Sequence, residues 1–419
     1  MKTHFINNRH KVFKILKDNS LAVFHSGYEQ FKSADASYPF CVNNNFYYLT
    51  GIDQVDVTLI IARLNNRYEE RLFIAQNDPT LSKWVGAKLT IEEAEDISGI
   101  KTDNIYYNPN FENMMKNYLQ PLRYSFDVIE TVYLDLEQRD YPFYQTFALQ
   151  YAKDLRKKFP AIKLENIYSH LIEMRMIKDE WEIDLIKKSI KTTKNAIENV
   201  MRHILKLSNE AEAEAHHNFV LTCENKRPSF ENIVAGGKNA TILHYINNFQ
   251  LLDKDSLLLM DVGCYTNNYA SDITRVIPVS GKFSARQKEV YEVVLDVNKK
   301  CIEYAKAGIT WQELNEYAQN LLAKGCIKLG LITDKSDLNR YYYHSIGHSL
   351  GLDVHDPSIA RLGLKPGMVI TIEPGLYIEE EGIGIRIEDN ILIREKESLN
   401  LSKTIIKEVK EIEDFIKNA

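Results

Sequence analysis

Four carboxylates and one imidazole in the second half of the chain could together bind metal ions. They are Asp261, Asp272, His348, Glu373 and Glu388. Such a hard, oxygen-rich set with one nitrogen suits two divalent ions of the Mn, Co, Fe or Zn type better than one structural zinc. Four negative charges offset two doubly positive ions, so a hydroxide could bridge them. Two ions about 3.5–4 Å apart would lower the pKa of that water and hold the attacking and carbonyl oxygens.

The two aspartates lie in neighbouring strand-like stretches, 258–263 and 269–275. A hairpin turn at 266–267 makes Asp261 face Asp272, with the two Cβ atoms roughly 5 Å apart. Two carboxylates that close repel each other unless one is protonated or a cation is bound. This favours a metal site, and the alternative is a solvated polar face on a hairpin.

Three histidines cluster within twelve residues, at His344, His348 and His355, out of eleven in the chain. Histidine is a common ligand of transition metals and titrates near neutral pH. Gly347 and Gly351 between them allow a close approach of backbone, which suits a crowded site. The alternative is that each is an ordinary packed or surface histidine.

Glu373 closes an apolar strand at 367–375, where alternation places it on one face with Val369 and Thr371. The following Pro374 and glycine end the strand. A carboxylate at this position needs a partner, because an unpaired buried charge is costly.

A last strand-like stretch, 382–389, places Gly382, Gly384, Arg386 and Glu388 on one face. The two glycines remove side-chain bulk beside the charged pair, so we expect them to leave room for a ligand. The alternative is an ordinary half-exposed strand whose Arg and Glu lie in water.

These residues must be positioned by elements that the pattern partly predicts. In the first half, 46–50 and 57–62 are rich in β-branched and aromatic residues and indicate strands, whereas 92–97 indicates a short helix. The pattern of apolar and polar residues changes near 165–175. We therefore expect one domain over 1–170 and a second over 171–419.

The second domain shows strands at 256–278 and 366–394 with helices around them, which predicts an α+β domain. A helical period starts at Asp179. Ser284 and Thr310 each fit a capping box with Gln or Glu three residues later, and Gly308 is expected to cap the end of the first of these two helices.

Composition limits the classes of partner. The chain has 419 residues, a net charge of −6 and a pI of about 6.1, so nucleic acid is not an expected partner. No stretch approaches the roughly 20 apolar residues that span a bilayer, and residues 1–14 lack the apolar core of a secretory signal. Five cysteines without a CxxC pair predict reduced thiols in a cytoplasmic protein: Cys41, Cys223, Cys264, Cys301 and Cys326.

The chain resembles aminopeptidase P (Xaa-Pro aminopeptidase), one of the pita-bread metallopeptidases that include prolidase and methionine aminopeptidase. The resemblance covers nearly the whole chain. It rests on the ligand motifs in family order and on the stretches 45–51 (NFYYLTG), 84–86 (WVG), 373–377 (EPGLY) and 384–389 (GIRIED). It implies an α+β pita-bread catalytic domain with a smaller α/β N-terminal domain, and hydrolysis of the bond between an N-terminal residue and a following proline.

The resemblance also implies roles for the five ligands. Asp261 would bind one metal through both oxygens, Asp272 and Glu388 would bridge the two metals, and His348 with Glu373 would hold the other. The expected metal is Mn²⁺. A bridging hydroxide would attack the carbonyl, and Glu373 would carry the proton to the leaving nitrogen.

The remaining roles implied by the resemblance concern the substrate. His244 would steady the tetrahedral intermediate, and His355 would lie near the scissile carbonyl. His344, Tyr377 and Arg386 would line the pocket for proline. Because the proline ring is rigid and its nitrogen has no N–H, that pocket should be apolar and close-fitting.

Two positions in the N-terminal domain bear on the substrate end. Trp84 matches an aromatic residue that helps to close the pocket, and the alternative is a core tryptophan. Asn45 stands where many relatives have an acidic residue, in a loop that often reaches across a subunit interface, so contacts there are open. We expect a homodimer or higher homo-oligomer that acts on peptides with proline in second position, away from membranes.

Three other functions compete. A prolidase would share the chemistry but accept only dipeptides, and the sequence leaves this open. A non-catalytic binding module on the same fold is disfavoured, because relatives of that kind lose metal ligands and all five are present here. The same five residues disfavour a metal-free hydrolase of the creatinase kind.

Overall fold

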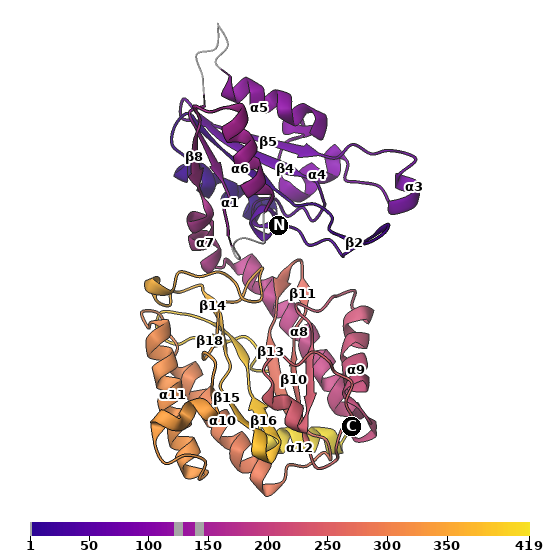
Figure 1. Cartoon of the computed structure of the whole chain (residues 1–419), viewed down its shortest axis with the longest axis vertical. Coiled ribbons are helices and arrows are strands. Elements are labelled where there is room, and N and C mark those ends of the chain that lie inside the picture. The colour runs from indigo at the N-terminus through magenta and orange to yellow at the C-terminus, as the bar shows by residue number, and fades with distance from the viewer. Residues whose placement is uncertain (1, 121–128, 139–145) are drawn as a thin grey trace. The chain divides into compact units, whose positions relative to one another are not determined.

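The computed structural model describes residues 2–120, 129–138 and 146–419. The chain divides into two compact units, Met1–Arg175 and Met176–Ala419. Each contains both helices and strands (Figure 1).

The N-terminal unit is built on a six-stranded mixed sheet of order β6-β5-β4-β1-β7-β8. The central strand β1 pairs antiparallel with β4 and parallel with β7. The apolar core of the unit includes side chains from β1 and β4, such as Leu21 and Ile60. The sheet strands are β1 Ser20–His25, β4 Thr58–Leu64, β5 Arg67–Ile74, β6 Ile105–Tyr107, β7 Thr131–Leu134 and β8 Lys163–Asn166, and a small hairpin consists of β2 Phe31–Ser33 and β3 Ala36–Ser37.

Seven α-helices of the described residues accompany these strands: α1 Lys2–Ile15, α2 Asn44–Thr50, α3 Ser82–Val85, α4 Ile91–Ser98, α5 Phe111–Leu119, α6 Phe147–Lys158 and α7 Tyr168–Met176. The strand expected at 57–62 and the helix expected at 92–97 are confirmed by β4 and α4.

The strand expected at 46–50 is wrong, because these residues belong to helix α2. The Asn43 side chain accepts a hydrogen bond from the Phe46 backbone N–H and caps the start of the helix, and Gly51, in the left-handed region with φ of 70°, ends it. These two caps outweigh the β-propensity of the aromatic residues between them.

The C-terminal unit places its strands between helices (Figure 1). Helix α8 packs on β11, β12 and β13, whereas α10 packs on β14, β15 and β16. The strands are β9 Ile233–Gly236, β10 Leu257–Val262, β11 Tyr265–Thr266, β12 Tyr269–Ala270, β13 Ile273–Pro278, β14 Val369–Ile372, β15 Gly375–Ile378, β16 Ile383–Arg386, β17 Asp389–Leu392 and β18 Leu399–Asn400. The helices are α8 Glu180–His203, α9 Glu210–Cys223, α10 Ala285–Tyr304, α11 Trp311–Lys328 and α12 Val409–Lys417.

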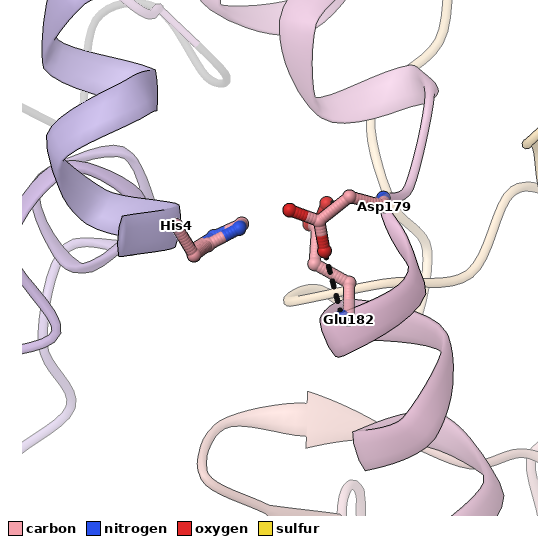
Figure 2. A group of neighbouring side chains, drawn as sticks. All are labelled: His4, Asp179 and Glu182. Atoms are coloured by element: carbon pink, nitrogen blue, oxygen red, sulfur yellow. Dashed lines mark hydrogen bonds between the residues drawn. The ribbon is translucent and has the colours of Figure 1, made fainter. Parts of the chain in front are cut away.

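The helix starts follow from local capping. Asp179 precedes α8, and its carboxylate accepts a hydrogen bond of 3.0 Å from the Glu182 backbone N–H, as Figure 2 shows. The capping boxes expected at Ser284 and Thr310 are both present. The expected cap at Gly308 is wrong: α10 ends at Tyr304, and its C-cap residue, Ala305, is extended.

The register of the β10–β13 pair differs from the expected one. Asp261 pairs with Thr274 and not with Asp272. The turn lies at Asn267 and Asn268, one position further along than expected, and both have positive φ (47° and 62°). Asparagine tolerates this conformation and favours two-residue hairpin turns of this kind. Asp272 lies two positions before Thr274, so it still shares a face with Asp261, diagonally across the pair.

Candidate metal centre

The five predicted ligands lie on or beside strands of the C-terminal unit. Asp261 is on β10, and Asp272 lies between β12 and β13. Glu373 directly follows β14, Glu388 lies between β16 and β17, and His348 is in the irregular segment before β14. Each carboxylate therefore lies on or within two residues of a paired strand, where the backbone is held by ladder hydrogen bonds.

The structure brings these side chains together. His348 Nε2 lies 3.4 Å from Asp272 Oδ2 and 3.5 Å from Glu373 Oε1. Ligand atoms of Asp272, His348 and Glu388 all lie within 4.8 Å of one another. Asp272 and Glu388 are almost fully buried. The group has the donor types and the closeness that a site for divalent cations needs.

Two buried oxygens of this group accept no hydrogen bond from the described residues. They are Asp261 Oδ1 and Glu388 Oε1. Their sister oxygens are occupied: Asp261 Oδ2 accepts from Arg386 at 2.6 Å, and Glu388 Oε2 accepts from the Thr274 hydroxyl at 2.8 Å. A buried carboxylate oxygen without a donor is costly, and metal ions bound beside these oxygens would remove that cost. The residues present therefore fit a metal centre.

The mutual repulsion of the carboxylates contributes to the raised pKa values of two of them. Burial raises the pKa of Asp272 well above its usual range, and the neighbouring Asp261 and Glu373 raise it further. Burial likewise raises the pKa of Glu388, with Asp272 the strongest neighbouring charge. Such a group becomes stable in its ionised form when cations enter it.

A second set of predicted residues forms a hydrogen-bonded chain beside the carboxylates. His344 Nε2 lies 2.8 Å from the Tyr377 hydroxyl, which accepts from Arg386 Nη1 at 2.9 Å. Arg386 Nη2 then donates to Asp261. Burial raises the pKa of Tyr377 and lowers that of His344. These hydrogen bonds link the predicted proline pocket to the predicted metal ligands.

His355 and His244 lie at the same site but are more exposed. The ring of His355 contacts that of His348, with centroids 4.1 Å apart. The pKa of His355 is lowered by partial burial and then by His348, and His244 and Glu373 are close enough to contribute. Both histidines are exposed, which suits side chains that would meet a substrate.

The surroundings of Trp84 and Asn45, in the N-terminal unit, differ from those considered in the sequence analysis. Trp84 is 82% exposed on the short helix α3, so the core alternative is wrong. Asn45 is in helix α2 rather than in a loop, and it is buried. Its amide donates to Asp135 at 2.8 Å and accepts from Arg175 at 2.7 Å. At this position, asparagine is a neutral bridge between a carboxylate and a guanidinium.

Several neighbours of the site carry no marked sequence pattern. The Thr371 hydroxyl donates to Glu373 Oε1 at 3.1 Å, and Thr274 also accepts from Arg386. Their place on the same face of their strands as Glu373 and Asp261 is the only signal that could have found them. The expected room beside Gly384 is wrong, because a Cβ there would lie 2.2 Å from the Ala240 carbonyl oxygen. The glycine makes room for backbone rather than for a ligand.

A buried polar layer supports the strands that carry the glutamates. The Asn298 amide of α10 donates to the carbonyls of Ile372 and Ile387, which directly precede Glu373 and Glu388, at 3.1 and 3.0 Å. Its oxygen accepts from Lys407 at 2.7 Å.

An ion pair completes this layer. Arg275 donates to the Glu388 carbonyl at 2.6 Å and pairs with Asp389 at 2.9 Å, and the Asp389 carboxylate also accepts from Lys407. Both members of the pair are fully buried. The backbone on both sides of Glu388 is therefore held in place by this buried polar layer.

Comparison with known proteins shows the family of the chain. The profile of Metallopeptidase family M24 matches residues 184–395, and that of the Aminopeptidase P, N-terminal domain matches residues 5–125. The Xaa-Pro aminopeptidase of Haemophilus influenzae is 32% identical over 438 residues, which cover 99% of this chain and 97% of the relative. The chain belongs to metallopeptidase family M24.

Solved structures agree with this assignment over the full length. A Bacillus anthracis chain assigned as an aminopeptidase P superposes with a TM-score of 0.94 and 42% identity, covering 100% of this chain and 98% of that one. Aminopeptidase P of Escherichia coli, solved with the inhibitor Pro-Leu, superposes with a TM-score of 0.90 and 27% identity, with the same coverage. The expected fold and family are confirmed, and this M24 chain is a metalloexopeptidase of the aminopeptidase P type. Among the described residues, no helix is long and apolar enough to cross a membrane.

Proposed function

We propose that this M24 chain removes the N-terminal residue from peptides whose second residue is proline, using two divalent ions with Mn²⁺ as the first choice. The observation that carries the proposal is the convergence of four carboxylates and one imidazole, spread over 261–388, on one largely buried group. Relatives that cover nearly the whole chain and are themselves Xaa-Pro aminopeptidases support the same substrate class.

Each ligand has a proposed role. Asp261 would hold one ion, His348 and Glu373 would hold the other, and Asp272 and Glu388 would contribute to both. The buried oxygens of Asp261 and Glu388 that accept no hydrogen bond support this set. The position of His348 Nε2 between Asp272 and Glu373 supports it as well.

The bound ions would supply an activated water and polarise the scissile carbonyl. Glu373 takes up the proton of the attacking water and delivers it to the leaving nitrogen. A proline nitrogen within a peptide carries no hydrogen, so it cannot leave as an amine without that proton. The Thr371 hydroxyl, which donates to Glu373 Oε1, keeps the carboxylate in one orientation during this transfer.

The histidines and the hydrogen-bonded chain act on the substrate. His244 and His355 donate hydrogen bonds where negative charge develops on the carbonyl oxygen. His344, Tyr377 and Arg386 form the wall of the pocket that receives proline, and their mutual bonds hold that wall rigid. We also assign Trp84 to substrate binding, because its ring is largely exposed and available to contact a peptide.

A panel of Xaa-Pro peptides of increasing length, assayed with added Mn²⁺, tests the proposal. We expect release of the first residue from Arg-Pro-Pro and from longer peptides, and no release when alanine replaces the second residue. Enzyme treated with a chelator is the control, and its activity should return with Mn²⁺.

Two other results would replace the proposal. Rapid cleavage of Gly-Pro with none of Arg-Pro-Pro would indicate a prolidase. Purified protein that binds no metal and stays inactive after Mn²⁺ addition would indicate a binding module on this fold.

We also propose a cytoplasmic homo-oligomer. Cys223, Cys264, Cys301 and Cys326 are free thiols, and Cys223 is exposed, which suits a reducing compartment. Exposed apolar side chains such as Phe31, Leu81 and Val85 suit contact with a second copy. Light scattering coupled to size-exclusion chromatography would measure the assembly, and a monomer at micromolar concentration would contradict it.

A further inference from the structure

The carboxylate of Glu210 gathers one loop around itself. Glu210 is the first residue of α9 and has no exposed surface. Its Oε1 accepts from the Gly236 backbone N–H and the Asn239 amide, both at 2.8 Å. Its Oε2 accepts from the Tyr245 hydroxyl at 2.8 Å and the Gln250 backbone N–H at 2.9 Å. All four donors belong to the segment 236–250 that leaves strand β9.

These four bonds use the full accepting capacity of one carboxylate. They also require its negative charge. A glutamine of the same shape would turn an NH₂ group toward two of the four donors and would lose those bonds. The Glu210 backbone N–H donates in turn to the Gln250 carbonyl at 2.9 Å, which closes the loop at its far end.

The loop carries His244, the neighbour of Tyr245. The Tyr245 side chain is buried and held by Glu210, whereas His244 is exposed and lies close enough to His355 to influence its pKa. The same loop is seated on strand β16, where the Ala240 carbonyl occupies the space above Gly384. Thus the segment is fixed on one side to a site strand and on the other to a single buried charge.

We propose that Glu210 is a positioning residue for the peptidase reaction: it holds the segment 236–250 so that His244 faces the scissile carbonyl. This inference rests on the proposed function, and in particular on the role of His244. Glu210 touches neither the proposed metal ligands nor the proline pocket by any hydrogen bond among the described residues. It should therefore act on the rate of the chemical step and leave metal binding alone.

The first test is Glu210→Gln in the whole enzyme loaded with Mn²⁺. We expect kcat to fall about 10- to 100-fold, the size of effect that a misplaced catalytic group produces. KM for a Xaa-Pro peptide and the Mn²⁺ affinity, measured by calorimetric titration, should stay within about twofold of the parent. Glu212→Gln is the matched control. Glu212 lies on the same first turn of α9, but among the described residues its carboxylate accepts hydrogen bonds only from Ser208 and Asn209, so the kcat of this variant should not change.

The decisive test combines Glu210→Gln with His244→Ala. If Glu210 acts through His244, Glu210→Gln should cause no further loss of kcat in the His244→Ala background. Equal losses in both backgrounds, or an unchanged kcat in Glu210→Gln, would overturn the inference. An unchanged kcat in His244→Ala alone would instead overturn the proposed role of His244, so the two failures are distinguishable.

Tyr245→Phe keeps the inference testable if Glu210→Gln does not fold. This change removes one of the four bonds, together with the bond that the Tyr245 hydroxyl accepts from Asn239, and keeps the buried ring. We expect a smaller loss of kcat, about 3- to 10-fold, that is again absent in the His244→Ala background. A Tyr245→Phe enzyme with the parent kcat would also overturn the inference.

Discussion

Replacement of Asn298 by leucine should weaken the C-terminal unit and its metal site together. Leucine has the same number and branching of side-chain heavy atoms, so the outline of the side chain is largely kept while three hydrogen bonds disappear. The Asn298 amide loses its bonds to the carbonyls of Ile372 and Ile387, and Lys407 loses an acceptor. Each neutral bond contributes about 1 kcal/mol and the bond from the ammonium about 1.5–3 kcal/mol, so we expect a loss of about 4 kcal/mol.

Native-state hydrogen exchange in increasing urea, read by mass spectrometry, measures the opening free energy of each unit in the whole chain. Peptides from β14 and β17 should lose about 4 kcal/mol of protection, and peptides from β1 and β4 should not change. Because Asn298 fixes the backbone before Glu373 and Glu388, the Mn²⁺ affinity should fall about 10- to 100-fold.

Asn8 offers a matched control. Its amide donates to the Tyr48 carbonyl at 3.1 Å and its oxygen accepts from Lys11 at 3.1 Å, within the N-terminal unit. Asn8→Leu should destabilise β1 and β4 and leave Mn²⁺ affinity unchanged. A loss under about 1 kcal/mol in Asn298→Leu, the value of one hydrogen bond, would refute the reasoning, and so would an unchanged Mn²⁺ affinity.

Three further predictions follow from single contacts. His348→Ala should lower both metal content and activity by orders of magnitude in a folded protein, as elemental analysis and peptide assay would show; full activity would contradict the ligand set. Gly384→Ala should cost about 1–3 kcal/mol, because its Cβ would lie 2.2 Å from the Ala240 carbonyl oxygen, and an unchanged urea midpoint would count against that contact. Burial lowers the pKa of His217 to about 4, so the unfolded chain takes up this proton first. Stability should therefore fall by up to about 3 kcal/mol as pH drops from about 6.5 to about 4, and His217→Gln should flatten that fall in urea titrations; an equal slope in parent and variant would refute it.

The residues that meet at the site could be named from sequence because strand periodicity places alternate side chains on one face. Arg386 and Glu388 were expected on one side of their strand, and both reach the group around Asp261. The domain types and the ligand order followed from the resemblance, because short motifs keep their order in a family. Residue type and spacing carry this information without any knowledge of register.

Register and short helices could not be read in the same way. One extra residue on the strand before the turn moved the partner of Asp261 to Thr274, and the choice depended on which asparagines adopt positive φ. Helix α2 was hidden because its residues favour strands and only its caps, Asn43 and Gly51, indicate a helix. Local propensity is a weak signal where two caps define a segment of seven residues.

The residues that support the site, Asn298 and Glu210, could not be found from the sequence. Asn298 bonds to carbonyls 74 and 89 positions away, and Glu210 bonds to donors 26 to 40 positions away. Backbone carbonyls and amides are the same in every residue, so the partners of these side chains leave no mark in the sequence. Such contacts emerge only when the strands are already paired.

The contacts of Asp389 make the placement of Glu388 depend on residues that follow it in the chain. This carboxylate is held by Ser402 and Lys407, and Arg275 beside it bonds to the carbonyls of Ile405 and Ile406. A nascent polypeptide that has emerged from the ribosome only as far as Glu388 has every proposed ligand but not the segment that braces the last of them. The proposed ligand Glu388 should therefore reach its final position only when the segment 402–407 has folded against Asp389.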